Sequence, residues 1–143
     1  MTILDASALI GFLAGQPAAE QVAELLNARD TAIISVNLAE TIDHLERVEG
    51  HSSREVLDPI DELIELGLSV LPVHQRDGRR AGELRASHYS RRTNPVALAD
   101  CLLLASAIGR QARIATSDGA LAELAQQLSV EVVVLPDSAG RLP

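Results

Sequence analysis

Short runs of apolar, often β-branched residues alternate along the chain with longer segments whose apolar residues recur every three or four positions. The short runs are typical of strands buried in a sheet, and the longer segments indicate helices with one buried face. The predicted strands cover residues 3–4, 31–35, 68–73, 112–116 and 130–135. The predicted helices cover residues 8–13, 17–29, 37–48, 56–66, 77–89, 96–108 and 119–128. This alternation predicts a parallel sheet flanked by helices.

Three local signals refine this pattern. Ser35 or Asn37 is expected to cap the third helix, because short polar side chains accept hydrogen bonds from the first free N–H groups of a helix. Asp58 and Pro59 are expected to interrupt the fourth helix, since proline lacks the N–H that a helix interior needs. Pro72 predicts that the third strand lies at the edge of the sheet, where a missing N–H leaves no neighbour unpaired.

Length and composition agree with a single α/β domain. The chain has 143 residues, without an internal repeat or a second domain, and we expect one domain over residues 1–136 and a tail over 137–143. Apolar residues make up 47% of the chain but aromatics only 1%. The core must therefore be built from Leu, Val, Ile and Ala, which suits a three-layer fold with a central five-stranded parallel sheet.

Net charge and the arginine distribution point in different directions. The formal charge of −8 argues against a general nucleic-acid binder. The chain has no lysine, however, and six of its twelve arginines lie between residues 76 and 92, with Asp77 and Glu83 as the only acids there. This segment is either a solvated helix face or a surface that binds an anion.

Other features bear on the compartment. Cys101 is the only cysteine, which excludes an internal disulfide and fits a reducing environment. The sequence shows neither an apolar run of about 20 residues nor the basic and apolar regions of a signal peptide. A soluble cytoplasmic protein without membrane contact is expected.

Four acidic residues are predicted to meet at one edge of the sheet. Asp5 and Asp118 directly follow the first and fourth strands, and Glu40 lies early in the helix after the second strand. Asp100 is expected in the second turn of the most apolar helix, just ahead of the fourth strand. Since ligands of open α/β sheets bind outside the carboxyl ends of the strands, these side chains should share a crevice.

Carboxylates gathered in this way repel each other, and a divalent cation removes the conflict. Mg²⁺ prefers oxygen ligands, lowers the pKa of a bound water and screens charge on phosphoryl oxygens, so the site suits phosphodiester hydrolysis. Ser7 and Thr116 stand beside the acids and could orient a water or a ligand, or cap adjacent helices. Simpler alternatives remain: Asp100 could pair with Arg91 or Arg92, and Glu40 could merely favour a helix start.

The motifs around the four acids resemble those of a known family. They are Ile-Leu-Asp-Ala-Ser at residues 3–7, Asn-Leu-Ala-Glu at 37–40, Leu-Ala-Asp-Cys-Leu-Leu-Leu-Ala at 98–105 and Ala-Thr-Ser-Asp at 115–118. In this order, and over nearly the whole chain, they are similar to PIN-domain ribonucleases, specifically the VapC-type toxins of bacterial toxin–antitoxin pairs.

The resemblance implies a function. It implies a Mg²⁺ or Mn²⁺ site made by Asp5, Glu40, Asp100 and Asp118, and an endoribonuclease that hydrolyses RNA with a metal-activated water. It also implies frequent homodimerisation and inhibition by a small antitoxin protein. The apolar helices over residues 38–66 could form the antitoxin groove or an ordinary core face. The predicted contacts to RNA phosphates are Arg80, Arg85, Arg91 and Arg92.

Two other classes of protein compete with the ribonuclease. A receiver-like signalling domain also gathers acids around Mg²⁺, but it needs an adjacent acidic pair after the first strand and a lysine after the last. This chain has Asp5 alone and no lysine. A catalytically silent PIN-like binding module is the other alternative, and the presence of all four acids argues against it.

Overall fold

The structure is a computed structural model that describes residues 1–90 and 95–143. Its strands form one parallel sheet in the order β3-β2-β1-β4-β5. The strands are β1 (Thr2–Leu4), β2 (Thr31–Ile34), β3 (Ser69–Leu71), β4 (Arg113–Thr116) and β5 (Val132–Val134). The helices are α1 (Ala6–Leu13), α2 (Ala19–Asn27), α3 (Ser35–Asp43) with a π-helical extension (His44–Val48), α4 (Ser53–Glu65), α5 (Gln75–His88), α6 (Leu98–Arg110) and α7 (Gly119–Gln127).

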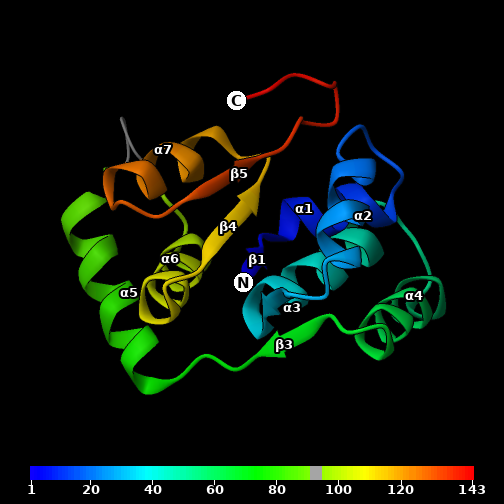
Figure 1. The fold of residues 1–143 in the computed structure, drawn as a ribbon, viewed down its shortest axis with the longest axis horizontal. Coiled ribbons are helices and arrows are strands. Elements are labelled where there is room, and N and C mark those ends of the chain that lie inside the picture. The colour runs from blue at the N-terminus through cyan, green and yellow to red at the C-terminus, as the bar shows by residue number, and fades with distance from the viewer. Residues whose placement is uncertain (91–94) are drawn as a thin grey trace.

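The sheet is buried on both faces, so the fold has three layers (Figure 1). Alternate residues of a strand point to opposite faces. Ile3 and Ile34 pack with α6 and α7 on one side, whereas Leu4 and Ile33 pack with α1 and α2 on the other. Burial on both faces is why these strands read as continuous apolar runs and not as alternating ones.

The predicted fold class is confirmed, and so is the position of the third strand. β3 pairs only with β2 and closes the sheet on that side, as the missing N–H of Pro72 predicted. Asp58 and Pro59 do not start a fresh helical turn, because α4 continues through both residues from Ser53 to Glu65. The helix instead begins with a capping box in which Ser52 and Glu55 satisfy each other's backbone N–H groups.

Two predictions about helix starts are also wrong. Neither Ser35 nor Asn37 caps α3; its N-cap residue is Ile34, without a side-chain cap. α6 begins at Leu98 and continues past Gly109 to Arg110, so Asp100 lies in its first turn and not in its second. The short run of apolar residues ahead of Leu98 concealed the true start.

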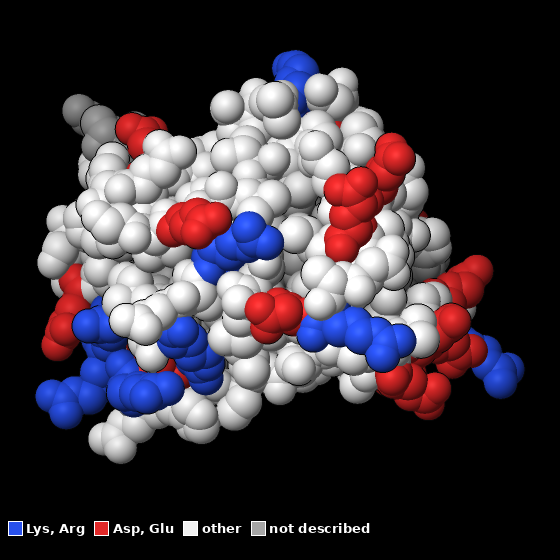
Figure 2. Space-filling view, in the orientation of Figure 1, with Lys and Arg blue, Asp and Glu red and all other residues white. Residues whose placement is uncertain are grey.

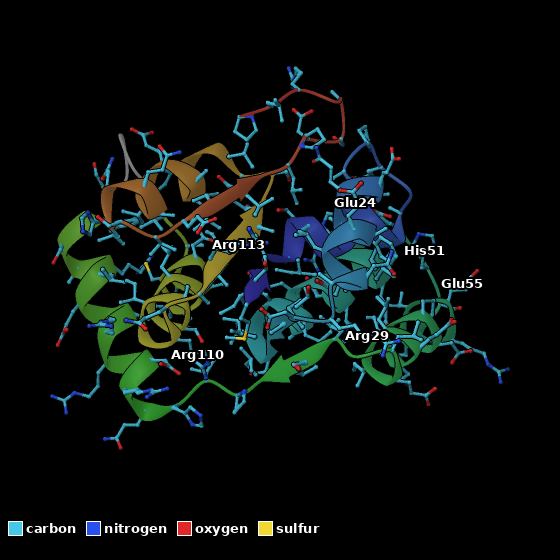
Figure 3. The ribbon with its side chains drawn as sticks, in the orientation of Figure 1. Glu24, Arg29, His51, Glu55, Arg110 and Arg113 are labelled. Carbon is cyan, nitrogen blue, oxygen red and sulfur yellow. The ribbon has the colours of Figure 1, made fainter. Side chains whose placement is uncertain are left out.

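Several helices begin at the carboxyl edge of the sheet. α1, α3 and α7 follow β1, β2 and β4 at this edge, and α6 runs back from it to the start of β4. The first turns of these four helices carry or adjoin the four predicted acids. The opposite edge holds a buried ion pair, in which Asp77 of α5 lies 3.7 Å from Arg110 at the end of α6. Figure 3 labels Arg110.

Candidate active site

Asp5 is the fixed point of the site. It follows β1 as the N-cap residue of α1, and only 6% of its surface is exposed. Its Oδ2 accepts hydrogen bonds from the hydroxyls of Ser7 at 2.7 Å and Thr116 at 2.9 Å, while its Oδ1 accepts one from Asn37 at 2.9 Å. Three donors from three segments therefore hold the carboxylate in one orientation.

Asn37 links Asp5 to Glu40. It is fully buried in the first turn of α3, and its Nδ2 donates to Asp5 and, at 3.4 Å, to Glu40 Oε2. Its own Oδ1 is buried and has no hydrogen-bond partner among the described residues. A buried amide oxygen in this condition is costly, and the unpaired oxygen belongs to the side chain that links Asp5 to Glu40.

Glu40 shows the electrostatic consequence of this closeness. Its side chain comes from the second turn of α3. Partial burial, and to a smaller extent repulsion from Asp5, raises the pKa of its carboxyl above the ordinary value.

Asp118 lies at the start of α7 as its N-cap residue. Its Oδ1 accepts N–H bonds from Ala120 at 2.8 Å and Leu121 at 3.1 Å, so this acid caps α7.

Asp100 is the acid most affected by its surroundings. Burial raises its pKa to about 6, and the nearby charges of Asp5, Asp118 and Glu40 act in the same direction. A hydrogen bond from the N–H of Ala97 to Asp100 Oδ2, at 3.0 Å, opposes the shift. The charges of the three other predicted acids therefore all reach Asp100 at the carboxyl edge.

The oxygen atoms gathered at this site are of the chemical type that binds a hard divalent cation. Carboxylate and amide oxygens are the ligands that Mg²⁺ and Mn²⁺ prefer. An ion would offset both the burial and the neighbouring negative charges that raise the pKa of Asp100. Among residues 1–90 and 95–143, no three Asp, Glu, His or Cys side chains stand together as a ready-made cage. Glu40 and Asp118 are exposed, so their side chains can turn towards Asp5 and Asp100 without disturbing the core.

Ser7 and Thr116, which were expected to orient a water or a ligand, turn their hydroxyls towards Asp5. The two oxygens are also 3.3 Å apart, and Ser7 Oγ accepts the N–H of Ser117. Their contribution here is therefore to position Asp5. The role of Asn37 is not evident from the sequence, because an asparagine after a strand equally fits a helix cap.

The arginines that were predicted to contact RNA phosphates lie in two places where the structure describes them. Basic side chains gather over α5 in Figure 2, where Arg80 lines a hollow of about 520 Å³ with Arg76 and Arg79, beside the C-terminal half of α6. That half points away from the carboxyl edge. Arg85 instead donates to the carbonyl of Val96 at 3.4 Å, next to the start of α6. Arg91 and Arg92 lie outside the described residues.

The arrangement of acids at strand ends is matched by a family model for the PIN domain, which covers residues 2–127. The chain belongs to the PIN domain family. This match includes all four acids and both hydroxyls that hold Asp5. A comparison with curated proteins gave no match.

Solved structures share the PIN fold of this chain at low identity. DNA-bound VapBC from Salmonella typhimurium is 22% identical, with a TM-score of 0.71, over 92% of this chain and 96% of that one. VapC20 of Mycobacterium tuberculosis, a toxin that cleaves the sarcin–ricin loop, is 18% identical with a TM-score of 0.69, over 86% and 94%. FitAcB from Neisseria gonorrhoeae is 21% identical with a TM-score of 0.66, over 92% and 96%.

Proposed function

We propose that this PIN domain is a metal-dependent endoribonuclease and the toxin of a type II toxin–antitoxin pair. The observation that carries the proposal is the gathering of four carboxyls at one edge of the sheet. Three hydrogen bonds hold Asp5, and the pKa of Asp100 is raised to about 6, chiefly by burial and further by the charges of Asp5, Asp118 and Glu40. Strongly shifted pKa values of buried groups beside other charges are typical of functional sites. The family supports hydrolysis of RNA, and the Mycobacterium tuberculosis neighbour is itself a toxin that cleaves the sarcin–ricin loop.

Each residue has a distinct part in this proposal. Asp5, Glu40, Asp100 and Asp118 would hold Mg²⁺ or Mn²⁺, which when bound lowers the pKa of a water and screens charge on the phosphoryl group. Ser7, Thr116 and Asn37 hold the Asp5 carboxylate in one orientation through their three hydrogen bonds.

Arginines would bring the RNA to the acids. Arg85 contacts the chain just ahead of α6, close to the turn that carries Asp100. Arg80 lies further from this turn along α5. Phosphates pair with guanidinium groups, and such contacts make affinity depend on salt. Arg91 and Arg92, just ahead of α6 in the sequence, complete the proposed set.

Partner proteins follow from the neighbours. The Klebsiella pneumoniae and Salmonella typhimurium structures are toxin–antitoxin complexes. We propose that this chain likewise binds a small antitoxin, and that it forms a homodimer in the cytoplasm. An apolar hollow between α2 and α4, which includes Leu26, Leu63 and Leu66, offers a groove for an antitoxin helix. No helix among the described residues has the length and apolarity to cross a membrane.

The decisive experiment is cleavage of total RNA by the purified protein in Mg²⁺ or Mn²⁺. Cleavage that stops in EDTA and with Asp100→Asn supports the nuclease and its metal site. Glu123→Gln, which removes an exposed acid from α7, is the matched control and should cleave like the wild type. Cleavage that persists in Asp100→Asn would reject the assigned site. Absence of cleavage by a protein that still binds Mn²⁺ would favour a binding module.

A further inference from the structure

One face of α5 carries a hollow that the acid site does not explain. Its lining residues recur at helical spacing and meet the first residue of α6, and the hollow measures about 330 Å³. They are Gly82, Arg85, Ala86, Tyr89 and Leu98. A Cβ placed on Gly82 would meet nothing within 4 Å, so the space above this glycine is open.

Two large apolar side chains are left exposed at this hollow. Tyr89 is 45% exposed and Leu98 is 52% exposed. Tyr89 is also the only tyrosine of a chain that has no tryptophan. Exposed aromatic surface beside a polar rim is a common mark of a binding site.

Arg85 joins the hollow to the acid site. Its guanidinium carbon lies 4.5 Å from the centre of the Tyr89 ring, and its Nε donates to the carbonyl of Val96. Tyr89 is fixed in turn by a backbone N–H bond of 2.8 Å to the carbonyl of Arg85. The cation therefore stands between an aromatic ring and the first turn of α6, the turn that carries Asp100.

We propose that Tyr89, Arg85 and Leu98 form a stacking platform for an unpaired base of the RNA, next to the phosphate that is hydrolysed at the acid site. This inference rests on the proposed ribonuclease function and adds a residue that selects single-stranded RNA. Bases of single-stranded RNA stack on aromatic rings and on guanidinium planes. The small side chains of Gly82 and Ala86 leave the room that a flat base needs.

The chemistry favours a base over an apolar protein side chain. A ring paired with a guanidinium presents a flat surface beside a positive charge, which matches a base attached to a phosphate. The acids nearby repel the phosphate unless a cation is present, so the platform would supply affinity that does not depend on the metal.

The first test uses the fluorescence of Tyr89 as its own reporter. The full-length protein is titrated in EDTA with an oligoadenylate of about ten nucleotides, within the usual site size of single-strand binders. We expect quenching, after correction for absorbance with free N-acetyltyrosinamide. An abasic oligonucleotide with the same number of phosphates should bind weakly and leave the emission unchanged. Equal quenching by the abasic strand, or none by either, would overturn the platform.

Variants then separate stacking from charge. Tyr89→Leu should weaken binding of the labelled oligoadenylate by about 5- to 100-fold without altering its salt dependence. Tyr89→Phe should bind within about twofold of the wild type, because the ring remains. Arg85→Gln should lower the salt slope by about 0.7, the value for one phosphate contact on a single strand. Phe12→Leu, which removes the other aromatic residue of the chain, is the matched control and should leave binding unchanged.

A filling variant guards against misfolding as an explanation. Gly82→Leu should raise the melting temperature, since leucine is the better helix former, yet weaken oligoadenylate binding by occupying the hollow. Gly78→Leu changes the other exposed glycine of α5, one turn away and outside the hollow, and should raise the melting temperature with normal binding. If Gly82→Leu binds as well as Gly78→Leu, the hollow does not hold a base.

The outcome is separable from that of the ribonuclease. If the protein cleaves RNA with a metal but oligoadenylate does not quench Tyr89, the stacking platform is wrong and the ribonuclease proposal stands. Base-dependent quenching of Tyr89 in a protein that cleaves no RNA would support the platform and reject the nuclease.

Discussion

Asn37 donates a hydrogen bond of 2.9 Å to Asp5 across the junction of α3 and β1, although 32 residues separate them in the chain. The bond joins two neighbouring strands at their carboxyl ends, because β1 and β2 are paired. The fully buried side-chain amide of Asn37 thereby supplies a hydrogen-bond donor to the carboxylate of Asp5. The geometry of the acid site therefore depends on a neutral residue as much as on the acids.

Replacing Asn37 should damage the site more than the fold. Asn37→Leu leaves Asp5 with the two hydroxyl donors only, and we expect RNA cleavage to fall by about 10- to 100-fold, as for other partners of metal ligands. The free energy of unfolding should drop by about 1 to 3 kcal/mol. Cleavage rates and urea unfolding measure the two effects. Asn27→Leu, at an exposed position, is the control. Normal cleavage by Asn37→Leu would contradict the positioning role.

Asp100→Asn should stabilise the metal-free protein. Burial raises the pKa of the Asp100 carboxyl from 3.8 to about 6, so folding favours its neutral form. Its favourable contribution is complete below about pH 4 and is lost as the pH rises through about 6. Asparagine keeps the neutral state at every pH, and we expect a gain of about 1 to 3 kcal/mol at pH 8 in EDTA. Urea unfolding at pH 4 and pH 8 checks this; an equal effect at both values would contradict it.

The same carboxyl should make metal binding depend on pH. Protons compete with a cation for Asp100, whose pKa in the metal-free protein is about 6. The affinity for Mn²⁺ should therefore fall by up to about tenfold per pH unit below 6 and level off above about 7. Calorimetric titration measures the affinity and the protons released. A flat affinity between pH 5 and 7 would show that Asp100 does not bind the ion.

Asp118 should show two separable roles. Its Oδ1 caps α7 by accepting two backbone N–H bonds, which asparagine can also accept. Asp118→Ala should cost about 1 kcal/mol of stability, and Asp118→Asn much less. Both variants should lose Mn²⁺ affinity, since neither keeps the charge. Thermal unfolding and metal titration test this, and unchanged Mn²⁺ affinity in both would remove Asp118 from the site.

The buried pair at the opposite edge should matter for stability alone. Asp77 is 2% exposed and depends on Arg110, whose side chain is 14% exposed. Arg110→Met should lower the free energy of unfolding by about 1 to 3 kcal/mol by leaving the carboxylate without its buried cation. Arg76 also contacts Asp77, but its side chain is 64% exposed. Arg76→Met should therefore change the free energy of unfolding by less than about 0.5 kcal/mol. Equal effects of the two changes would contradict this assignment.

The strand and helix pattern of this chain could be predicted because it depends on local periodicity. Strands buried on both faces appear as short apolar runs, and parallel pairing follows from the helix between each pair. The position of β3 at the edge followed from Pro72 alone. Errors fell where local signals compete: Pro59 sits inside α4, because Ser52 and Glu55 supply a stronger helix start than proline supplies a stop.

The sequence by itself also placed four acids at one edge of a parallel sheet, since a residue directly after a strand must lie at that strand's end. Only the tertiary structure decided which side chains hold them. Ser7, Asn37 and Thr116 meet at Asp5 because β1 lies between β2 and β4, and the order of strands is not written in any local pattern. The exposure of Tyr89 beside Leu98 is likewise set by the packing of α5 on α6, which joins residues that periodicity treats separately.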